Sequence, residues 1–160
     1  MKILISLARQ RLDLFDDAGR ALRSYPVSTA ANGAGERKGS FCTPRGKHLI
    51  RAKIGAGQAP DTVFVARRPN GEIYAPELAA QYSERDWILT RILWLSGCEP
   101  GFNRLGDVDT MRRFIYIHGC PEGVAMGQPG SHGCIRMRNK DIVDLFDLVP
   151  IYTPVEIIDG

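Results

Sequence analysis

The chain has 160 residues, of which 44% are hydrophobic and 24% charged, and its formal net charge at pH 7 is +3. A chain of this length is expected to form one domain and to bury about 70% of the surface that its unfolded form exposes. The composition excludes a disordered tail, a coiled coil and a collagen-like fibre, and no apolar run approaches the roughly 18 residues of a membrane span.

The first third of the chain predicts four β-strands, because polar and apolar residues alternate over short runs between turn residues. The turn Asp17–Arg20 joins two of these runs, and its Gly19 can adopt a positive φ. The glycine-rich segment 30–40 lacks the spacing of a phosphate-binding loop, so we expect an ordinary loop there. The four predicted strands cover residues 2–8, 11–16, 21–28 and 47–54.

The rest of the chain adds further strands and one clear helix. Asn139 as N-cap, an acid in the first turn and an amphipathic stripe predict a helix that Pro150 ends. We therefore expect one mostly β domain over residues 1–160, a β-sandwich or barrel with six to eight strands and one or two short helices. Strands are predicted at 62–66, 87–95, 112–118 and 155–158, with a turn at 69–71 and an insertion of uncertain structure at about 55–111.

Charge and the opening residues bear on partners and compartment. Residues 1–60 carry eleven Lys and Arg against four Asp and Glu, a balance that can attract anionic ligands. The chain lacks a basic run with interleaved aromatic residues, which is the pattern typical of nucleic-acid binding. The opening MKILISLARQ resembles a secretory signal, but Arg9 interrupts it and no small-residue cleavage site follows. We expect a cytoplasmic protein, or a periplasmic one whose export signal was removed.

Two histidine–glycine–cysteine triplets, at 118–120 and 132–134, lie between a predicted strand and the predicted helix. Catalysis by cysteine needs a thiolate, and a basic neighbour such as histidine lowers the thiol pKa. The adjacent backbone N–H groups of Gly133 and Cys134 can stabilise a tetrahedral oxyanion. This segment therefore supplies a nucleophile, a base and oxyanion donors, which are sufficient for acyl transfer. All four cysteines, Cys42, Cys98, Cys120 and Cys134, are expected to be free thiols.

Two other interpretations of these residues remain open. A histidine at a strand end can be a satisfied polar residue, and a lone cysteine can be a small buried hydrophobe. Alternatively, His118, Cys120, His132 and Cys134 offer two nitrogen and two sulfur ligands for a zinc-stabilised binding module. Structural zinc usually has two to four residues between paired ligands, whereas each pair here has one.

The segment 131–137 (SHGCIRM), followed by Asn139, resembles the signature of the L,D-transpeptidase catalytic domain family, also called YkuD-like. That family has a histidine–glycine at a strand end, then a loop and Ser/Thr-His-Gly-Cys; here His118 precedes Cys134 by sixteen positions. Tyr25–Thr29, Thr43–Gly46 and the closing Val155–Ile158 also resemble family stretches. The resemblance covers residues 2–54 and 112–158, while 55–111 departs from a minimal domain.

The resemblance implies a role for each residue of the catalytic group. Cys134 is the implied nucleophile, His118 its base, and the carbonyl of Gly119 the group that holds the imidazole tautomer. Ser131, His132 and Gly133 are implied to line the site. The N–H groups of residues 132–134 are expected to receive the oxyanion.

The roles of Arg136 and Cys120 are less determined. Arg136 either orients the motif or binds a substrate carboxylate, with an ion pair to Asp141 or Asp144 as the alternative. Cys120 has no family role, and we expect it to be inert or to trap Cys134 as a disulfide under oxidation.

By resemblance, the chain is a cysteine acyltransferase that cleaves peptidoglycan stem tetrapeptides between the diamino acid and D-Ala through a thioester, without cofactor or metal. We expect a cytoplasmic L,D-carboxypeptidase that trims soluble muropeptides from cell-wall recycling. The alternative is a periplasmic L,D-transpeptidase that forms cross-links. Carbapenem-type β-lactams are expected to acylate Cys134.

Overall fold

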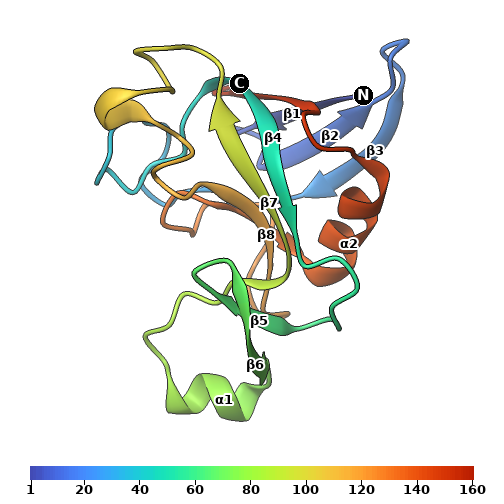
Figure 1. The fold of residues 1–160 in the computed structure, drawn as a ribbon, viewed down its shortest axis with the longest axis vertical. Helices are drawn as coiled ribbons and strands as arrows, with labels where there is room; N and C mark the ends of the chain where they lie inside the picture. The colour runs from blue at the N-terminus through green and yellow to red at the C-terminus, as the bar shows by residue number, and fades with distance from the viewer.

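A computed structural model describes residues 1–160 and contains ten β-strands and two short α-helices (Figure 1). A single 3₁₀ turn, Gly106–Val108, is the remaining regular element. In chain order the elements are β1 (Lys2–Ser6), β2 (Arg11–Phe15), β3 (Ala21–Pro26), β4 (Gly46–Ile54), β5 (Thr62–Val65), β6 (Arg68–Ile73), α1 (Pro76–Gln81), β7 (Leu89–Gly97), β8 (Tyr116–Cys120), β9 (Ile135–Arg138), α2 (Asn139–Leu148) and β10 (Pro154–Ile158).

All ten strands belong to one curled mixed sheet, which confirms the predicted mostly β class. The order is β3-β2-β1-β10-β4-β7-β5-β6, and β8 pairs with both β7 and β9. Two pairs are parallel, β1 with β10 and β8 with β9, and the others are antiparallel. Because the last strand lies between β1 and β4, the two ends of the chain meet at one end of the molecule (Figure 1).

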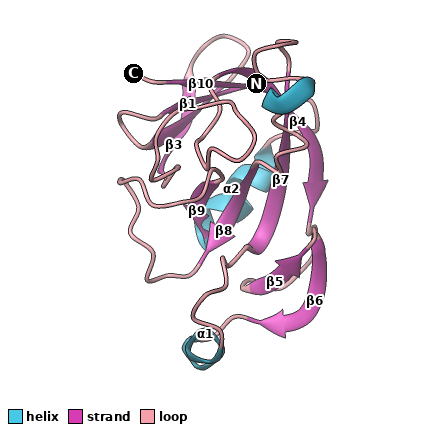
Figure 2. Cartoon of the chain, turned by 90° about the vertical axis from the view of Figure 1, so that its left-hand side faces the viewer, coloured by secondary structure: helices cyan, strands magenta, loops and turns pink.

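The main core is a cluster of 19 buried hydrophobic residues contributed by both ends of the chain. Helix α2 covers this core with Ile142, Leu145 and Phe146, and it lies behind β7 and β8 in Figure 2. A smaller cluster of Phe64, Ile92 and Tyr116 packs on another part of the sheet. No helix here is both long and apolar enough to cross a bilayer.

The stretch 55–111 contains one central strand and a projecting group of elements. Strand β7 pairs with β4, β5 and β8, so it belongs to the middle of the sheet. By contrast, β5, β6 and α1 project at the end of the molecule opposite both termini, and α1 buries no residue (Figures 1 and 2).

The predicted positions of one turn and one strand were wrong. The turn expected at 69–71 lies within β6, and the chain reverses instead at Ala66–Arg67, both with positive φ. Pro69 is tolerated in β6 because this edge strand pairs only with β5. The strand expected from residue 112 begins only at Tyr116, because the Asp109 carboxylate accepts the N–H of Arg112 and holds a turn there.

Asn139 is the first residue of α2, whereas the sequence predicted it as the N-cap. Arg138 holds the cap position and makes no side-chain cap bond. The Asn139 amide instead accepts a hydrogen bond from Thr90 Oγ1 at 2.7 Å and donates one to Asp61 Oδ1 at 2.8 Å. Tertiary partners therefore outweigh the local capping preference of this side chain.

Replacement of Ile157 by alanine tests the importance of β10. Ile157 is 1% exposed in the main core, so its loss leaves a cavity that costs about 2–5 kcal/mol of unfolding free energy. Ile73→Ala, at a side chain that is 54% exposed, is the matched control. Urea unfolding measures both variants, and equal losses would contradict the placement of the core.

Candidate active site

The register between β8 and β9 brings His118 and Cys134 to one face of the sheet. Ile117 pairs with Ile135, so Cys134 lies level with Tyr116, whose N–H donates to Cys134 Sγ at 3.3 Å. Ile117 and Ile135 face the main core. Because successive side chains of a strand alternate in direction, Tyr116, His118 and Cys134 share the opposite face.

The imidazole of His118 is fixed by its own neighbour. Its Nδ1 donates to the carbonyl oxygen of Gly119 at 2.6 Å, which leaves Nε2 without a proton. The side chain is fully buried, and Nε2 has no hydrogen-bond partner in the protein. The backbone carbonyl thus occupies the place that sequence reasoning assigned to it, and a free basic nitrogen remains.

Only glycine fits at position 119. A Cβ there would lie 2.6 Å from the carbonyl oxygen of Leu89, and it would also collide with Asn139 Oδ1. Thr90, beside Gly119, has a φ of +75°, a strained value for a β-branched residue. The hydrogen bond from Thr90 to Asn139 holds this geometry, so the first residue of α2 supports the peptide that orients His118.

Burial keeps both members of the pair uncharged. Partial burial raises the pKa of the Cys134 thiol well above its usual range, and burial lowers the pKa of His118. At neutral pH the thiol is therefore protonated and the imidazole neutral. Burial thus acts against the low-pKa thiolate that the sequence predicts. The thiol donates to the carbonyl of Phe114 at 3.3 Å, and no hydrogen bond joins it to His118.

The side chain of Ser131 stabilises the turn that precedes Cys134 by two hydrogen bonds. Its hydroxyl donates to the carbonyl of Cys134 at 2.6 Å and accepts the N–H of Gly133 at 3.2 Å. Ser131 is buried, so it shapes the turn and does not line the open site. The N–H groups of His132 and Cys134 have no acceptor within the protein, whereas that of Gly133 is occupied.

Sequence reasoning missed the part that Thr43 plays. Its hydroxyl donates to the carbonyl of Gly133 at 2.9 Å and accepts the N–H of Ala30 at 3.0 Å. Gly133 has a φ of +129°, and a Cβ there would approach the Cys42 carbonyl to 3.1 Å. The only signal in the sequence was the family-like Thr-Pro-x-Gly stretch, whose role required the fold.

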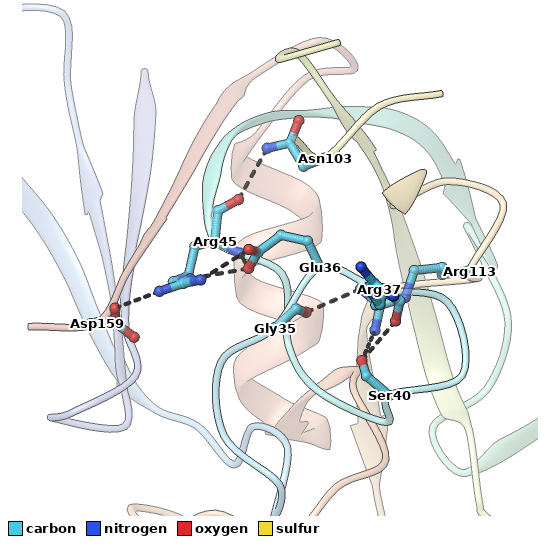
Figure 3. A network of polar contacts seen from close by, with 8 residues as sticks. All are labelled: Gly35, Glu36, Arg37, Ser40, Arg45, Asn103, Arg113 and Asp159. Carbon is cyan, nitrogen blue, oxygen red and sulfur yellow. Dashed lines mark hydrogen bonds and ion pairs between the residues drawn. The ribbon is translucent and has the colours of Figure 1, made fainter. Parts of the chain in front are cut away.

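Ion pairs and hydrogen bonds anchor the glycine-rich loop 30–45 (Figure 3). Arg45 pairs with Glu36 at 3.0 Å and with Asp159, near the C-terminus, at 3.1 Å. Arg113 donates to the carbonyl of Gly35 at 3.2 Å and to that of Cys42 at 2.7 Å. The loop is therefore anchored on two sides, which positions the Cys42 carbonyl against the turn.

Arg136 is paired with Asp86, a partner that the sequence did not indicate. The two are 2.8 Å apart, and Arg136 also donates to the carbonyl of Gly130 at 3.1 Å. The alternative pairing of Arg136 with Asp141 or Asp144 is wrong, since Asp86 holds its guanidinium. Asp86 belongs to the stretch 55–111, and only the fold brings it to the catalytic motif.

Of the two expectations for Cys120, the disulfide with Cys134 is contradicted, whereas an inert buried thiol agrees with the structure. Cys120 lies level with Arg138, so it is four strand residues, about 13 Å, from the level of Cys134. A disulfide requires Cα atoms within about 7 Å, so these cysteines cannot bridge. The thiol of Cys120 donates to the carbonyl of Met137 at 3.3 Å. No three or more His, Cys, Asp or Glu side chains lie close enough together to hold a metal ion. The four ligands of the zinc-stabilised module considered from the sequence therefore do not come together.

Three hollows adjoin at His132, an exposed side chain above the turn, and two of them contain further residues of the catalytic motif. One, about 290 Å³, contains Cys134 together with Arg67 and Tyr116. The other, about 340 Å³, contains the Arg136–Asp86 pair. His132 and Asp86 line both, so a ligand that reaches Cys134 lies within range of the second hollow.

The neutral resting pair makes a prediction for alkylation. With the pKa of Cys134 raised, the iodoacetamide reaction at this residue should rise about tenfold per pH unit between pH 7 and 9. Peptide mass spectrometry after short exposures gives the rate at Cys134 alone. A rate that is already maximal below pH 7 would show a thiolate at rest and contradict the neutral pair.

Comparison with known proteins identifies the family. The model of the L,D-transpeptidase catalytic domain (YkuD) matches residues 1–157. A 47-residue stretch is 47% identical to the probable L,D-transpeptidase YbiS of Escherichia coli and covers 29% of this chain and 15% of that protein. A 59-residue stretch is 41% identical to the putative L,D-transpeptidase YqjB of Bacillus subtilis and covers 37% and 32%. The matched stretches thus span less than a third of these curated relatives.

Solved structures share the fold along nearly the whole chain. Bd1075 of Bdellovibrio bacteriovorus superposes with a TM-score of 0.61 at 17% identity, over 99% of this chain and 48% of that one. The L,D-transpeptidase LdtMt1, solved in complex with imipenem, gives 0.58 at 19% identity over 98% and 57%. With a family model that matches all but its last three residues and a fold common to these structures, this chain belongs to the L,D-transpeptidase catalytic domain family.

Proposed function

We propose that this chain is a cysteine acyltransferase that cleaves peptidoglycan stem tetrapeptides at the L,D bond between the diamino acid and D-Ala. The observation that carries the proposal is that a half-buried thiol, Cys134, shares a sheet face with a buried His118 whose Nε2 is free and whose tautomer is fixed. A free base and a thiol on one sheet face supply the nucleophile and the general base of acyl transfer.

The proposed reaction begins from the neutral pair. As Cys134 Sγ attacks the carbonyl carbon of the diamino acid, its proton passes to Nε2 of His118. The oxyanion is received by the unoccupied N–H groups of His132 and Cys134. His118 then gives the proton to the nitrogen of D-Ala, the C–N bond breaks and a thioester remains.

The second half returns the enzyme to its starting state. The acceptor attacks the thioester carbon, His118 takes its proton, and the thiol leaves as Cys134 Sγ–H. Catalytic hydrogen bonds of a resting enzyme often tighten only when substrate is bound, which fits the present absence of a bond between Cys134 and His118.

For the acceptor we propose water, and for the compartment the cytoplasm. All four cysteines are free thiols, which suits a reducing compartment. There the available stem peptides are soluble muropeptides and water is the abundant acceptor, so the reaction is that of an L,D-carboxypeptidase in peptidoglycan recycling. Fractionation of cells that express the native gene tests the compartment.

One feature favours the second candidate, a periplasmic L,D-transpeptidase that forms cross-links. The hollow of about 340 Å³ that contains the Arg136–Asp86 pair adjoins the one that contains Cys134, and it offers space for an amine acceptor beside the thioester. Product analysis separates the two: tripeptide and D-Ala without dimers indicate hydrolysis, and efficient dimer formation at modest amine concentration indicates transpeptidation.

Cys134→Ala should abolish D-Ala release from a purified tetrapeptide, because the only other thiol on the face of His118, Cys120, is about 13 Å from the level of Cys134. Intact-mass analysis should likewise show a carbapenem adduct on the wild type and none on this variant. Cys120→Ala is the matched control and should keep most activity, since that thiol lies on a different level of the sheet. Adduct formation that persists in Cys134→Ala would place the nucleophile elsewhere.

His118→Ala should lower kcat/KM by about 10²–10⁴, the range for a lost general base. In the wild type, His118 must be neutral to accept a proton, and burial lowers its pKa. Activity should therefore persist below pH 6.5 and fall only as the pH drops through the lowered pKa. A kcat/KM profile with its acid limb at or above pH 6.5 would contradict a buried base.

A further inference from the structure

Besides Arg85, which pairs with Glu72 at 2.7 Å, three arginines line the two hollows, and two of these three are already occupied. Arg136 is neutralised by Asp86 at 2.8 Å. The guanidinium of Arg113 donates to the carbonyls of Gly35 and Cys42, and these hydrogen bonds anchor the loop 30–45. Neither has a free cationic group to offer a substrate, although Arg136 was the residue that the sequence favoured.

The third, Arg67, is held rigidly without an acidic partner. It lies at the turn between β5 and β6, half-buried, with its guanidinium 4.8 Å from the ring centre of Trp94 and 5.0 Å from that of Phe114. One nitrogen donates to the hydroxyl of Tyr116 at 3.0 Å. No carboxylate of the protein forms an ion pair with it.

Arg67 is also connected to the nucleophile. Tyr116, whose hydroxyl accepts from Arg67, donates its backbone N–H to Cys134 Sγ. Arg67 and Cys134 line the same hollow of about 290 Å³. A guanidinium has five N–H donors in a planar fork suited to carboxylates, and only one of these five is used within the protein.

The proposed substrate presents a carboxylate within reach. In a stem tetrapeptide the terminal carboxylate carbon is separated from the scissile carbonyl carbon by only the amide nitrogen and one Cα. Because consecutive Cα atoms are about 3.8 Å apart, this carboxylate must enter the same small hollow as the bond under attack. An unpaired cation in that hollow is the complementary group.

Resting on the proposed function, we propose that Arg67 binds the terminal carboxylate of the leaving D-amino acid and thereby selects peptides with a free C-terminus. The aromatic faces of Trp94 and Phe114 hold the guanidinium in place, so little side-chain entropy is lost on binding. Arg67 is thus a specificity-determining residue contributed by the projecting hairpin.

The test compares a tetrapeptide that ends in D-Ala with the same peptide ending in D-Ala amide. The wild type should prefer the free acid by about 10- to 100-fold in kcat/KM, the value of a charge-assisted hydrogen bond. Arg67→Met should reduce this ratio to about one while the amide is turned over as before. Arg67→Lys should restore part of the preference, and Arg68→Met, at an exposed neighbour in the same hairpin, should leave it unchanged.

An unchanged ratio in Arg67→Met, or an equal loss on both peptides, overturns the proposal; the latter marks a purely structural role. The rate of acylation by imipenem is a readout independent of peptide cleavage, since its carboxylate bears the same relation to the lactam carbonyl. A wild type that is acylated but cleaves no tetrapeptide refutes the proposed function, while the acylation rate of Arg67→Met still decides the role of Arg67. If the wild type is neither acylated nor active, the proposed function and the proposed role of Arg67 are both refuted.

Discussion

The parallel register of β8 and β9 is the constraint on which the whole site depends. It sets Cys134 level with Tyr116 and turns His118 to the same face, while Ile117 and Ile135 enter the main core. A shift by one residue would carry the thiol into the core and expose an isoleucine, because side chains alternate along a strand. Backbone hydrogen bonds of Arg136 with Ser28, 2.9 Å in each direction, hold β9 from its other side and resist such a shift.

Burial determines the chemical state of the pair. A thiolate and an imidazolium here would lose hydration, and the effect of burial outweighs that of the neighbouring arginines, so the neutral forms are favoured. The Gly119 carbonyl then has a single task, to fix the tautomer, and an uncharged acceptor is sufficient for it. Activation at the moment of attack also keeps the resting thiol from indiscriminate reaction, since the thiolate is the reactive species.

The hairpin β5–β6 and the segment that follows α1 bring charge to a site whose catalytic motif lies elsewhere in the chain. Asp86 neutralises Arg136, and Arg67 lies against Trp94 and beside Tyr116. Strand β6 and helix α1 bury no residue and project from the sheet, whereas β5 packs Phe64 into the smaller cluster, so β6 and α1 can vary without loss of the core. Loops on a rigid scaffold are the usual place of specificity, and here they surround one nucleophile.

The sequence by itself determined most strands, the helix α2 and the spacing of His118 and Cys134, because alternation, turn residues and a contiguous motif are local properties. It also yielded Gly119, whose peptide follows the base directly. Only the tertiary structure decided the pairing of Arg136 with Asp86, the separation of Cys120 from Cys134, and the raised pKa of the thiol. Each of these depends on burial and on contacts between residues far apart in the chain, which short-range patterns do not encode.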